Sequence, residues 1–231
     1  MNGAIYHIQL IDLLWILIPV FIVVVIYMRW TKDRSTIFYA LFRMLVQLIL
    51  IGYVLNYIFD TSSSYLVILV LSIMLVAASI ISLRPLQHTN RSLYLYSFIS
   101  ICVGGIFVLL IIVNGVLDLA FWYEPKFLIP ISGMIFANSM NAVSIAAERF
   151  ESEINKSTYI DARAVSYKSA LIPIINSLFA VGLVSLPGMM TGQILSGVDP
   201  LIAVRYQMMV MLMILGSAGI SVSIYLLLLK K

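Results

Sequence analysis

Methionine is concentrated in one part of the chain, where its thioether sulfurs could bind a metal ion. Six of the 12 methionines fall between residues 189 and 213: Met189, Met190, Met208, Met209, Met211 and Met213. Thioethers are soft ligands and suit Cu(I) better than Fe(II) or Mg(II). Methionine is also a flexible residue that fills gaps at moving helix interfaces. The cluster therefore indicates either metal ligation or adaptable packing, and it does not identify a metal.

Polar side chains interrupt the apolar runs at spacings that place them on single helix faces. Arg43 and Gln47 are four residues apart, as are Met134 and Asn138. A charge at the depth of Arg43 is costly, so it should face protein or water, or else snorkel to the headgroups. Buried amides either join helices or line a path. The predicted substrate path comprises Arg43, Gln47, Met134, Asn138, Asn141, Asn176, Met189, Met190 and Gln193.

A helix break is predicted at Pro187-Gly188, inside an apolar run that continues to Gly192. Because proline removes a backbone donor and clashes with the preceding turn, the helix must kink or end there. In lipid the freed backbone groups must be satisfied by protein or by a water-filled cavity. The spacing Gly188-x-x-x-Gly192 also predicts a close helix contact. The segment is expected to form part of a path or a gate.

Acidic residues and histidines are absent from the interiors of the apolar runs. Proton-coupled pumps usually carry such groups inside the membrane. Intramembrane proteases need buried acids, an H-E-x-x-H site or a nucleophile with its base. The chain also lacks the G-x-x-x-x-G-K-[ST] sequence of an ATP-binding P-loop. We therefore expect no catalytic residue, no cofactor and no ATP hydrolysis by this chain.

The elements that must position these residues are long apolar helices. Hydrophobic residues make up 62% of the 231 residues and charged residues 10%, and the mean hydropathy is +1.08. A soluble domain does not have this composition. A helix of about 20 residues crosses about 30 Å of hydrocarbon. The sequence predicts an all-α, multi-pass protein of the cell membrane with one domain, residues 1–231, and seven spans at about 10–28, 36–59, 65–83, 93–117, 127–147, 169–190 and 203–229.

The basic residues predict the orientation of the spans. With the N-terminus outside and the C-terminus in the cytoplasm, loops 29–35, 84–92 and 148–168 and the C-terminal tail hold 11 of the 14 lysines and arginines. Cytoplasmic loops carry such an excess of positive charge. The net charge of +4 is explained by this bias and indicates no nucleic-acid partner.

Loop 148–168 is the candidate surface for a cytoplasmic partner. It carries eight charged residues, and Arg149 and Glu153 form a favourable i, i+4 pair. An amphipathic segment of this kind suits docking, although a solvated extension of the fifth helix has the same pattern. The predicted anchors are Phe150 and Ile154, with Glu148, Arg149 and Glu153 around them. Loop 84–92, with Arg84, His88 and Arg91, is the next candidate.

Several segments together resemble the FetB-type iron-export permeases, which are membrane subunits of ABC transporters. They are Arg43-Met-Leu-Val-Gln47 through Phe59, Pro130-Ile-Ser-Gly-Met134 with Asn138-Ser-Met-Asn141, Ala170-Leu-Ile-Pro173, Leu186-Pro-Gly-Met-Met190, Asp199-Pro200 and Arg205-Tyr-Gln207. The resemblance implies a bacterial permease, a separate ATP-binding cassette subunit as partner, a homodimer of permease chains and efflux of metal, with iron as the first candidate. Plant relatives are linked to aluminium tolerance, so the fold alone does not fix the cargo.

One segment departs from the family pattern. After Glu153 the chain reads Ile-Asn-Lys-Ser-Thr-Tyr-Ile-Asp-Ala-Arg, and the loop is about a dozen residues shorter than in that pattern. This is the segment expected to couple to the ATPase, so the departure leaves the coupling open. A membrane scaffold or sensor, or a passive channel, is the alternative function. A neighbouring gene for a P-loop ATPase would favour the transporter.

Overall fold

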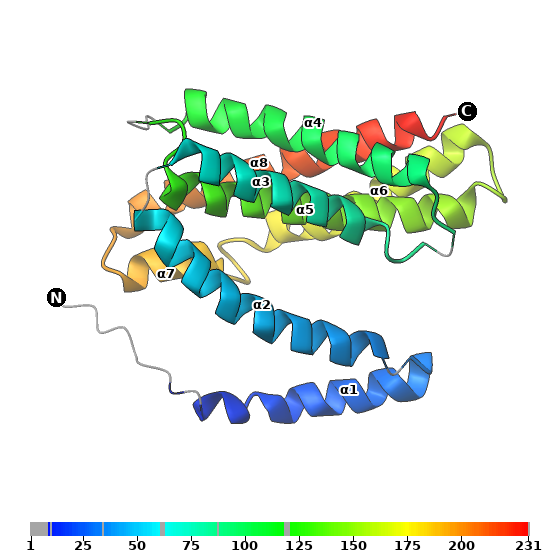
Figure 1. The fold of residues 1–231 in the computed structure, drawn as a ribbon. Coiled ribbons are helices and arrows are strands. Elements are labelled where there is room, and N and C mark those ends of the chain that lie inside the picture. The colour runs from blue at the N-terminus through cyan, green and yellow to red at the C-terminus, as the bar shows by residue number, and fades with distance from the viewer. Residues whose placement is uncertain are drawn as a thin grey trace. The chain divides into compact units, whose positions relative to one another are not determined.

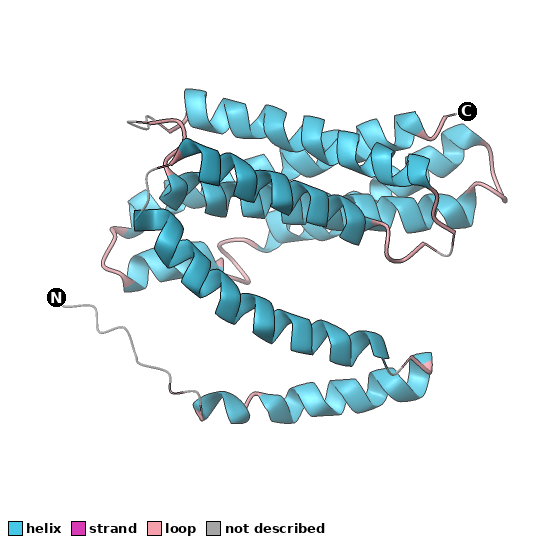
Figure 2. Ribbon diagram, viewed as in Figure 1, coloured by secondary structure: helices cyan, strands magenta, loops and turns pink. Residues whose placement is uncertain are grey.

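The computed structural model describes residues 9, 11–33, 35–60, 63–86, 88–117 and 121–230. The regular structure of these residues is helical, apart from one isolated bridge between Val181 and Ser185. This confirms the predicted all-α class (Figures 1 and 2). The helices are the short 3₁₀ helix η1 (Asp12–Leu14), α1 (Leu17–Thr31), α2 (Ser35–Asp60), α3 (Ser64–Ser82), α4 (Arg91–Gly115), α5 (Pro125–Glu153), α6 (Tyr159–Ala180), α7 (Gly188–Leu195) and α8 (Pro200–Leu228).

Six segments of the described chain are long and apolar enough to cross a membrane. They are η1 with α1, then α2, α3, α4, α5 and α8. The predicted sixth span, 169–190, is wrong in its limits, because α6 begins at Tyr159 and ends at Ala180. The first turns of α6 carry Asp161, Arg163 and Lys168, which lower its hydropathy. The described residues thus form six helical segments that are suited to crossing a membrane and a seventh long helix, as a multi-pass membrane protein requires.

Contacts divide the chain into two units, residues 1–61 and residues 62–231. In the first unit, α1 and α2 contact each other and leave most of their apolar side chains exposed. Asp33 begins α2, since its Oδ1 accepts hydrogen bonds from the backbone N–H groups of Ser35 and Thr36, both at 3.1 Å. Hydrogen bonding to Thr36 lowers the pKa of the Asp33 carboxyl. Surfaces as apolar as those of α1 and α2 suit lipid.

In the second unit, α4, α5 and α8 pack against one another and hold the core. Gly104 on α4 permits the closest approach, because a Cβ there would lie 2.8 Å from the backbone N of Ser221 on α8. A Cβ at Gly105 would lie 2.8 Å from the ring of Phe136 on α5. Small residues let helix backbones approach in this way inside membranes.

Buried serines join α3 to α4. The Oγ atoms of Ser82 and Ser97 are 2.7 Å apart and share a hydrogen bond. The Ser97 hydroxyl also lies 3.2 Å from the backbone carbonyl of Ser79 and donates to it. The sequence pointed to asparagines as the polar contacts between helices, whereas the described contacts between α3 and α4 use serine hydroxyls.

Candidate functional site

The helix break in the last third of the chain separates α6 from α7. Gly182 adopts φ +83°, and its N–H donates to the Ser185 carbonyl at 3.0 Å, so a tight turn follows Ala180. Pro187 then stands directly before α7. The predicted break is real, but α6 ends before Pro187 rather than at it. The predicted close helix contact at Gly188 and Gly192 is wrong, because no described atom lies within 4 Å of a Cβ at either position.

A cavity of about 440 Å³ lies between α5, α7 and α8, and we call it the first methionine cavity. Met134 from α5, Met189 from α7 and Met209 from α8 line it. Gln193 also lines it, and the Oε1 atom of this residue is buried and accepts no hydrogen bond from any described group. Lys126 stands at its edge, exposed. The cavity is mainly apolar, and the neutral side chains in its lining that could bind a ligand are the three methionines, Gln193 and Tyr206.

A second cavity, also of about 440 Å³, lies beside the end of α6, α7 and α8. Met190, Met208 and Met211 line this second methionine cavity. Gln207 lines it as well, is 6% exposed, and has an Oε1 atom without a hydrogen-bond partner among the described residues. Because Met189 and Met190 are neighbours on α7 and face different cavities, that short helix contributes to both walls.

The predicted path residues are only partly brought together. Met134, Met189 and Gln193 share the first cavity, and Met190 lines the second. Asn138 donates through Nδ2 to the carbonyl of Met134 at 2.8 Å, which satisfies one of its two amide N–H groups within its own helix. Asn141 and Asn176 are exposed and line neither cavity.

Arg43 and Gln47 do share one face of α2, as their spacing predicts. With the Gln47 amide oxygen turned toward Arg43, it accepts hydrogen bonds from Nη2 at 3.2 Å and from Nε at 3.0 Å. Both residues belong to the first unit, whereas the cavities belong to the second. The pairing satisfies part of the guanidinium inside an apolar helix, and a role in a path stays a prediction.

The predicted path left out Met209, Tyr206 and Gln207, although Met209 belongs to the methionine cluster noted in the sequence. Tyr206 and Met209 line the first cavity, and Gln207 lines the second. The sequence did contain a signal for Gln207, because a polar residue inside a long apolar helix indicates a functional site. Nothing in the sequence shows that neighbouring residues of α8 face two different cavities.

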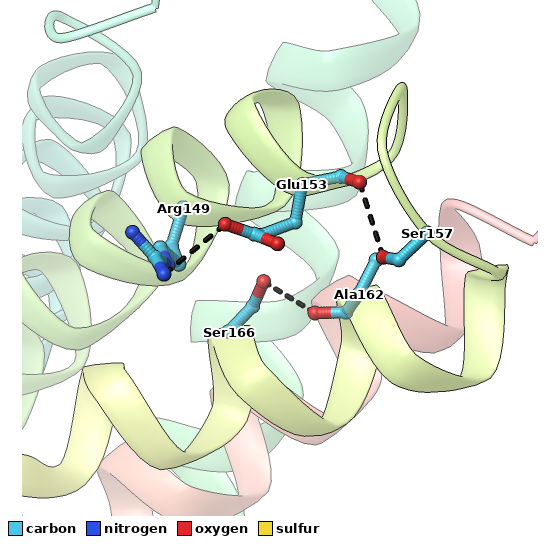
Figure 3. Close-up of polar contacts among 5 residues, drawn as sticks. All are labelled: Arg149, Glu153, Ser157, Ala162 and Ser166. Carbon is cyan, nitrogen blue, oxygen red and sulfur yellow. Dashed lines mark hydrogen bonds and ion pairs between the residues drawn. The ribbon is translucent and has the colours of Figure 1, made fainter.

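Segment 148–168 is not a loop, because it comprises the end of α5, a short turn and the start of α6. We call this segment the elbow. Arg149 and Glu153 form the predicted ion pair, with Nη2 and Oε1 3.1 Å apart (Figure 3). The Ser157 hydroxyl donates to the Glu153 carbonyl at 3.1 Å and helps to end α5. Thr158 caps α6, since its Oγ1 accepts from the backbone N–H of Asp161 at 3.3 Å.

The expected docking anchor Phe150 is a core residue instead. It is 8% exposed and packs edge-on against Tyr159, with ring centroids 5.9 Å apart. Arg163 covers the ring of Tyr159, with its Cζ 5.6 Å from the centroid. Of the two predicted anchors, only Ile154 is exposed, at 37%. Phe150 therefore stabilises the elbow, and Glu148 and Arg149 are exposed on its surface.

A polar groove of about 560 Å³ runs between the elbow and the connection from α3 to α4. The elbow contributes Glu148, Glu151 and Lys156, among others, and the connection contributes Pro85 and His88. The two segments that the sequence offers as alternative docking surfaces therefore form one surface. We call it the elbow groove.

The C-terminal end of α8 lies at the same end of the bundle as the elbow. The Tyr159 hydroxyl donates to the carbonyl of Leu226 at 2.7 Å. Three segments predicted to be cytoplasmic, the α3–α4 connection, the elbow and the end of α8, are thus gathered together. The first methionine cavity lies at the opposite ends of α5 and α8, where these helices begin. The side of the membrane on which each end lies remains a prediction.

Cysteine labelling tests this orientation. In a Cys102→Ser background, we expect Asn155→Cys in the elbow to react with a membrane-impermeant maleimide only after permeabilisation. Ser196→Cys, between α7 and α8, should react in intact cells, because it lies at the other end of the bundle. Both residues are exposed. The reverse labelling pattern would contradict an outside N-terminus and a cytoplasmic elbow.

Comparison with known proteins identifies similar sequences. The model of the "Uncharacterised protein family (UPF0014)" matches residues 10–231. The UPF0014 membrane protein slr1647 of Synechocystis sp. is 35% identical over 189 residues, which cover 75% of this chain and 73% of the relative. The "Probable iron export permease protein FetB" of Escherichia coli is 35% identical over 205 residues, 81% of this chain and 77% of the relative.

A plant protein is similar as well. The "Protein ALUMINUM SENSITIVE 3" of Arabidopsis thaliana is 28% identical over 215 residues, which cover 86% of this chain and 77% of the relative. No solved structure matches the chain.

Proposed function

Because the chain belongs to the UPF0014 family of membrane proteins, we propose that it is the membrane-spanning permease subunit of an ATP-driven exporter of metal ions. The observation that carries the proposal is the 35% identity to a relative named as a probable iron export permease, over 81% of this chain. Iron is therefore the first candidate cargo. We also propose that the protein forms a homodimer in the cell membrane of a bacterium, as its resemblance to the FetB-type permeases implies.

The energy for export would come from a partner chain. The sequence contains no P-loop of its own, so an ATP-binding cassette subunit must supply hydrolysis. The elbow groove supports this assignment, since it combines both segments expected to dock such a subunit. Its lining combines the acidic side chains of Glu148 and Glu151 with Lys156 and His88. Charged groups around an interface mainly set orientation and association rate.

Reconstitution tests the proposal against its alternatives. The chain is co-expressed with the P-loop ATPase encoded beside it, purified and placed in vesicles with its elbow outward. We expect ATP-dependent accumulation of Fe(II) inside these vesicles and stimulated ATP hydrolysis. Metal flux that needs no ATP would instead indicate a channel. Absence of both flux and ATPase binding would indicate a scaffold or sensor and would contradict the proposed function.

A charge reversal in the elbow groove is expected to weaken the ATPase complex. Lys156→Glu places a third acidic side chain beside Glu148 and Glu151, so association should slow and affinity should fall about three- to tenfold. Titration of labelled ATPase at two salt concentrations measures the change. Lys168→Glu is the matched control, because Lys168 is also exposed and lines none of the cavities described here. Equal loss in both variants would place the dock outside the groove.

A further inference from the structure

Methionines from three different helices line the first methionine cavity. Met134 lies on α5, Met189 on α7 and Met209 on α8. Met209 is 8% exposed and Met189 is 37% exposed, so the lining of the cavity extends from the interior of the bundle to its surface.

We propose that this cavity binds a soft monovalent metal ion of the Cu(I) or Ag(I) type. Thioethers are the ligands that select Cu(I) over harder first-row ions. This proposal goes beyond the proposed function, in which iron is the first candidate cargo, and it does not depend on that function. Binding itself is a property of this chain alone.

The composition of the cavity disfavours hard cations. Mg(II), Ca(II) and Mn(II) prefer carboxylate and carbonyl oxygens. Among the described residues, no group of three His, Cys, Asp or Glu side chains is placed to hold a metal. The electrostatic cost of moving an ion into an apolar medium rises with the square of its charge, so a monovalent ion is the least costly to bury. Neutral soft donors therefore match a soft ion of single charge.

Gln193 gives a second, independent reason for a cation. Its Oε1 atom is buried and has no donor among the described groups, and the residue lines the same cavity as the three methionines. A buried polar atom without a partner is unfavourable. A cation in the cavity would give this oxygen a positively charged partner. Lys126 at the edge is exposed and can keep its ammonium group in water.

Silver binding tests the proposal with a probe that does not change oxidation state. The purified full-length chain carries Cys102→Ser, so that its one thiol does not compete. Equilibrium dialysis with Ag(I) should give one tightly bound ion per chain, and X-ray absorption at the silver edge should show sulfur neighbours. Met134→Leu, Met189→Leu and Met209→Leu should each weaken binding at least tenfold. Because leucine and methionine are similar in volume, these variants should fold.

Two sets of control variants make the result specific. Met140→Leu changes a methionine on the same helix as Met134 that lines neither cavity, and Ag(I) affinity should stay unchanged. Met190→Leu and Met211→Leu alter the second cavity and should also leave it unchanged. Affinity that survives all three first-cavity substitutions, or that falls equally in the control variants, would overturn the proposal.

The outcome is separable from that of the proposed function. Silver binding is measured without the ATPase or ATP. If Ag(I) binds as expected but no metal is exported from reconstituted vesicles, the export function falls and the binding site stands. If iron is exported while Ag(I) does not bind to the three thioethers, the soft-ion site falls and the export function stands.

Discussion

Gly104→Leu is expected to destabilise the helix bundle by at least about 3 kcal/mol, the largest effect on stability among the substitutions considered. The Cβ atom of any side chain at Gly104 would lie 2.8 Å from the backbone N of Ser221. A flexible side chain can move away from such a clash, but a helix backbone moves only if α4 and α8 separate. Thermal unfolding in detergent should show a midpoint lowered by about 6–12 °C, at about 2–4 °C per kcal/mol.

Gly52→Leu is the matched control for this variant. Gly52 also lies within a long helix, and no described atom is within 4 Å of a Cβ at that position. Leucine favours helix more than glycine does by about 0.8–1 kcal/mol, so the control should be neutral or slightly more stable. Gly188→Leu should likewise leave the midpoint unchanged. A similar loss of stability in all three variants would show that the α4–α8 contact is not what Gly104 protects.

Gln207→Leu is expected to stabilise the protein and to abolish most of its transport. The amide Oε1 of Gln207 is buried without a hydrogen-bond partner among the described groups, which costs about 1–3 kcal/mol. An apolar side chain of similar size removes that cost, so the unfolding midpoint should rise by a few degrees. The same change removes the amide that lines the second methionine cavity together with the predicted path residue Met190, so metal efflux should fall at least tenfold if this cavity belongs to the path.

Opposite signs for stability and transport distinguish a functional residue from a structural one. Met140→Leu, on α5 and outside the lining of both methionine cavities, is the control and should change neither quantity strongly. If the Gln207→Leu protein is less stable than the wild type, the Gln207 amide of the wild type must form a hydrogen bond, for example with a water molecule. A more stable protein with normal efflux would remove Gln207 from the path.

Local patterns in the sequence predicted much of the fold. Run lengths of apolar residues located the long helices, because a span needs about 20 residues of helix. The Arg149–Glu153 pair was predictable as well, since residues four apart meet on one helix face. The end of α6 was not predicted correctly. The sequence favoured a break at Pro187, whereas the turn at Gly182 ends the helix earlier, at Ala180.

The candidate site was less predictable, because it depends on contacts between distant segments. Met134, Met189 and Met209 share a cavity only once α5, α7 and α8 have packed. Phe150 has the spacing of an exposed anchor, but Tyr159, beyond the turn, covers it. Sequence spacing gives the face of a helix on which a residue lies, and tertiary packing decides what that face meets.

Helix α5 is continuous from the first methionine cavity to the elbow groove, so a tilt of the helix about Pro130 would move Glu148 farther than Met134. Pro130 lies inside this helix and in the wall of the first methionine cavity, and a proline removes one bond of the helical ladder. At 1.5 Å per residue, Met134 is about 6 Å from this pivot and Glu148 about 27 Å. A swing of about 4.5 Å at the elbow groove thus becomes about 1 Å at the Met134 backbone, which is the scale on which a metal–ligand bond is made or broken.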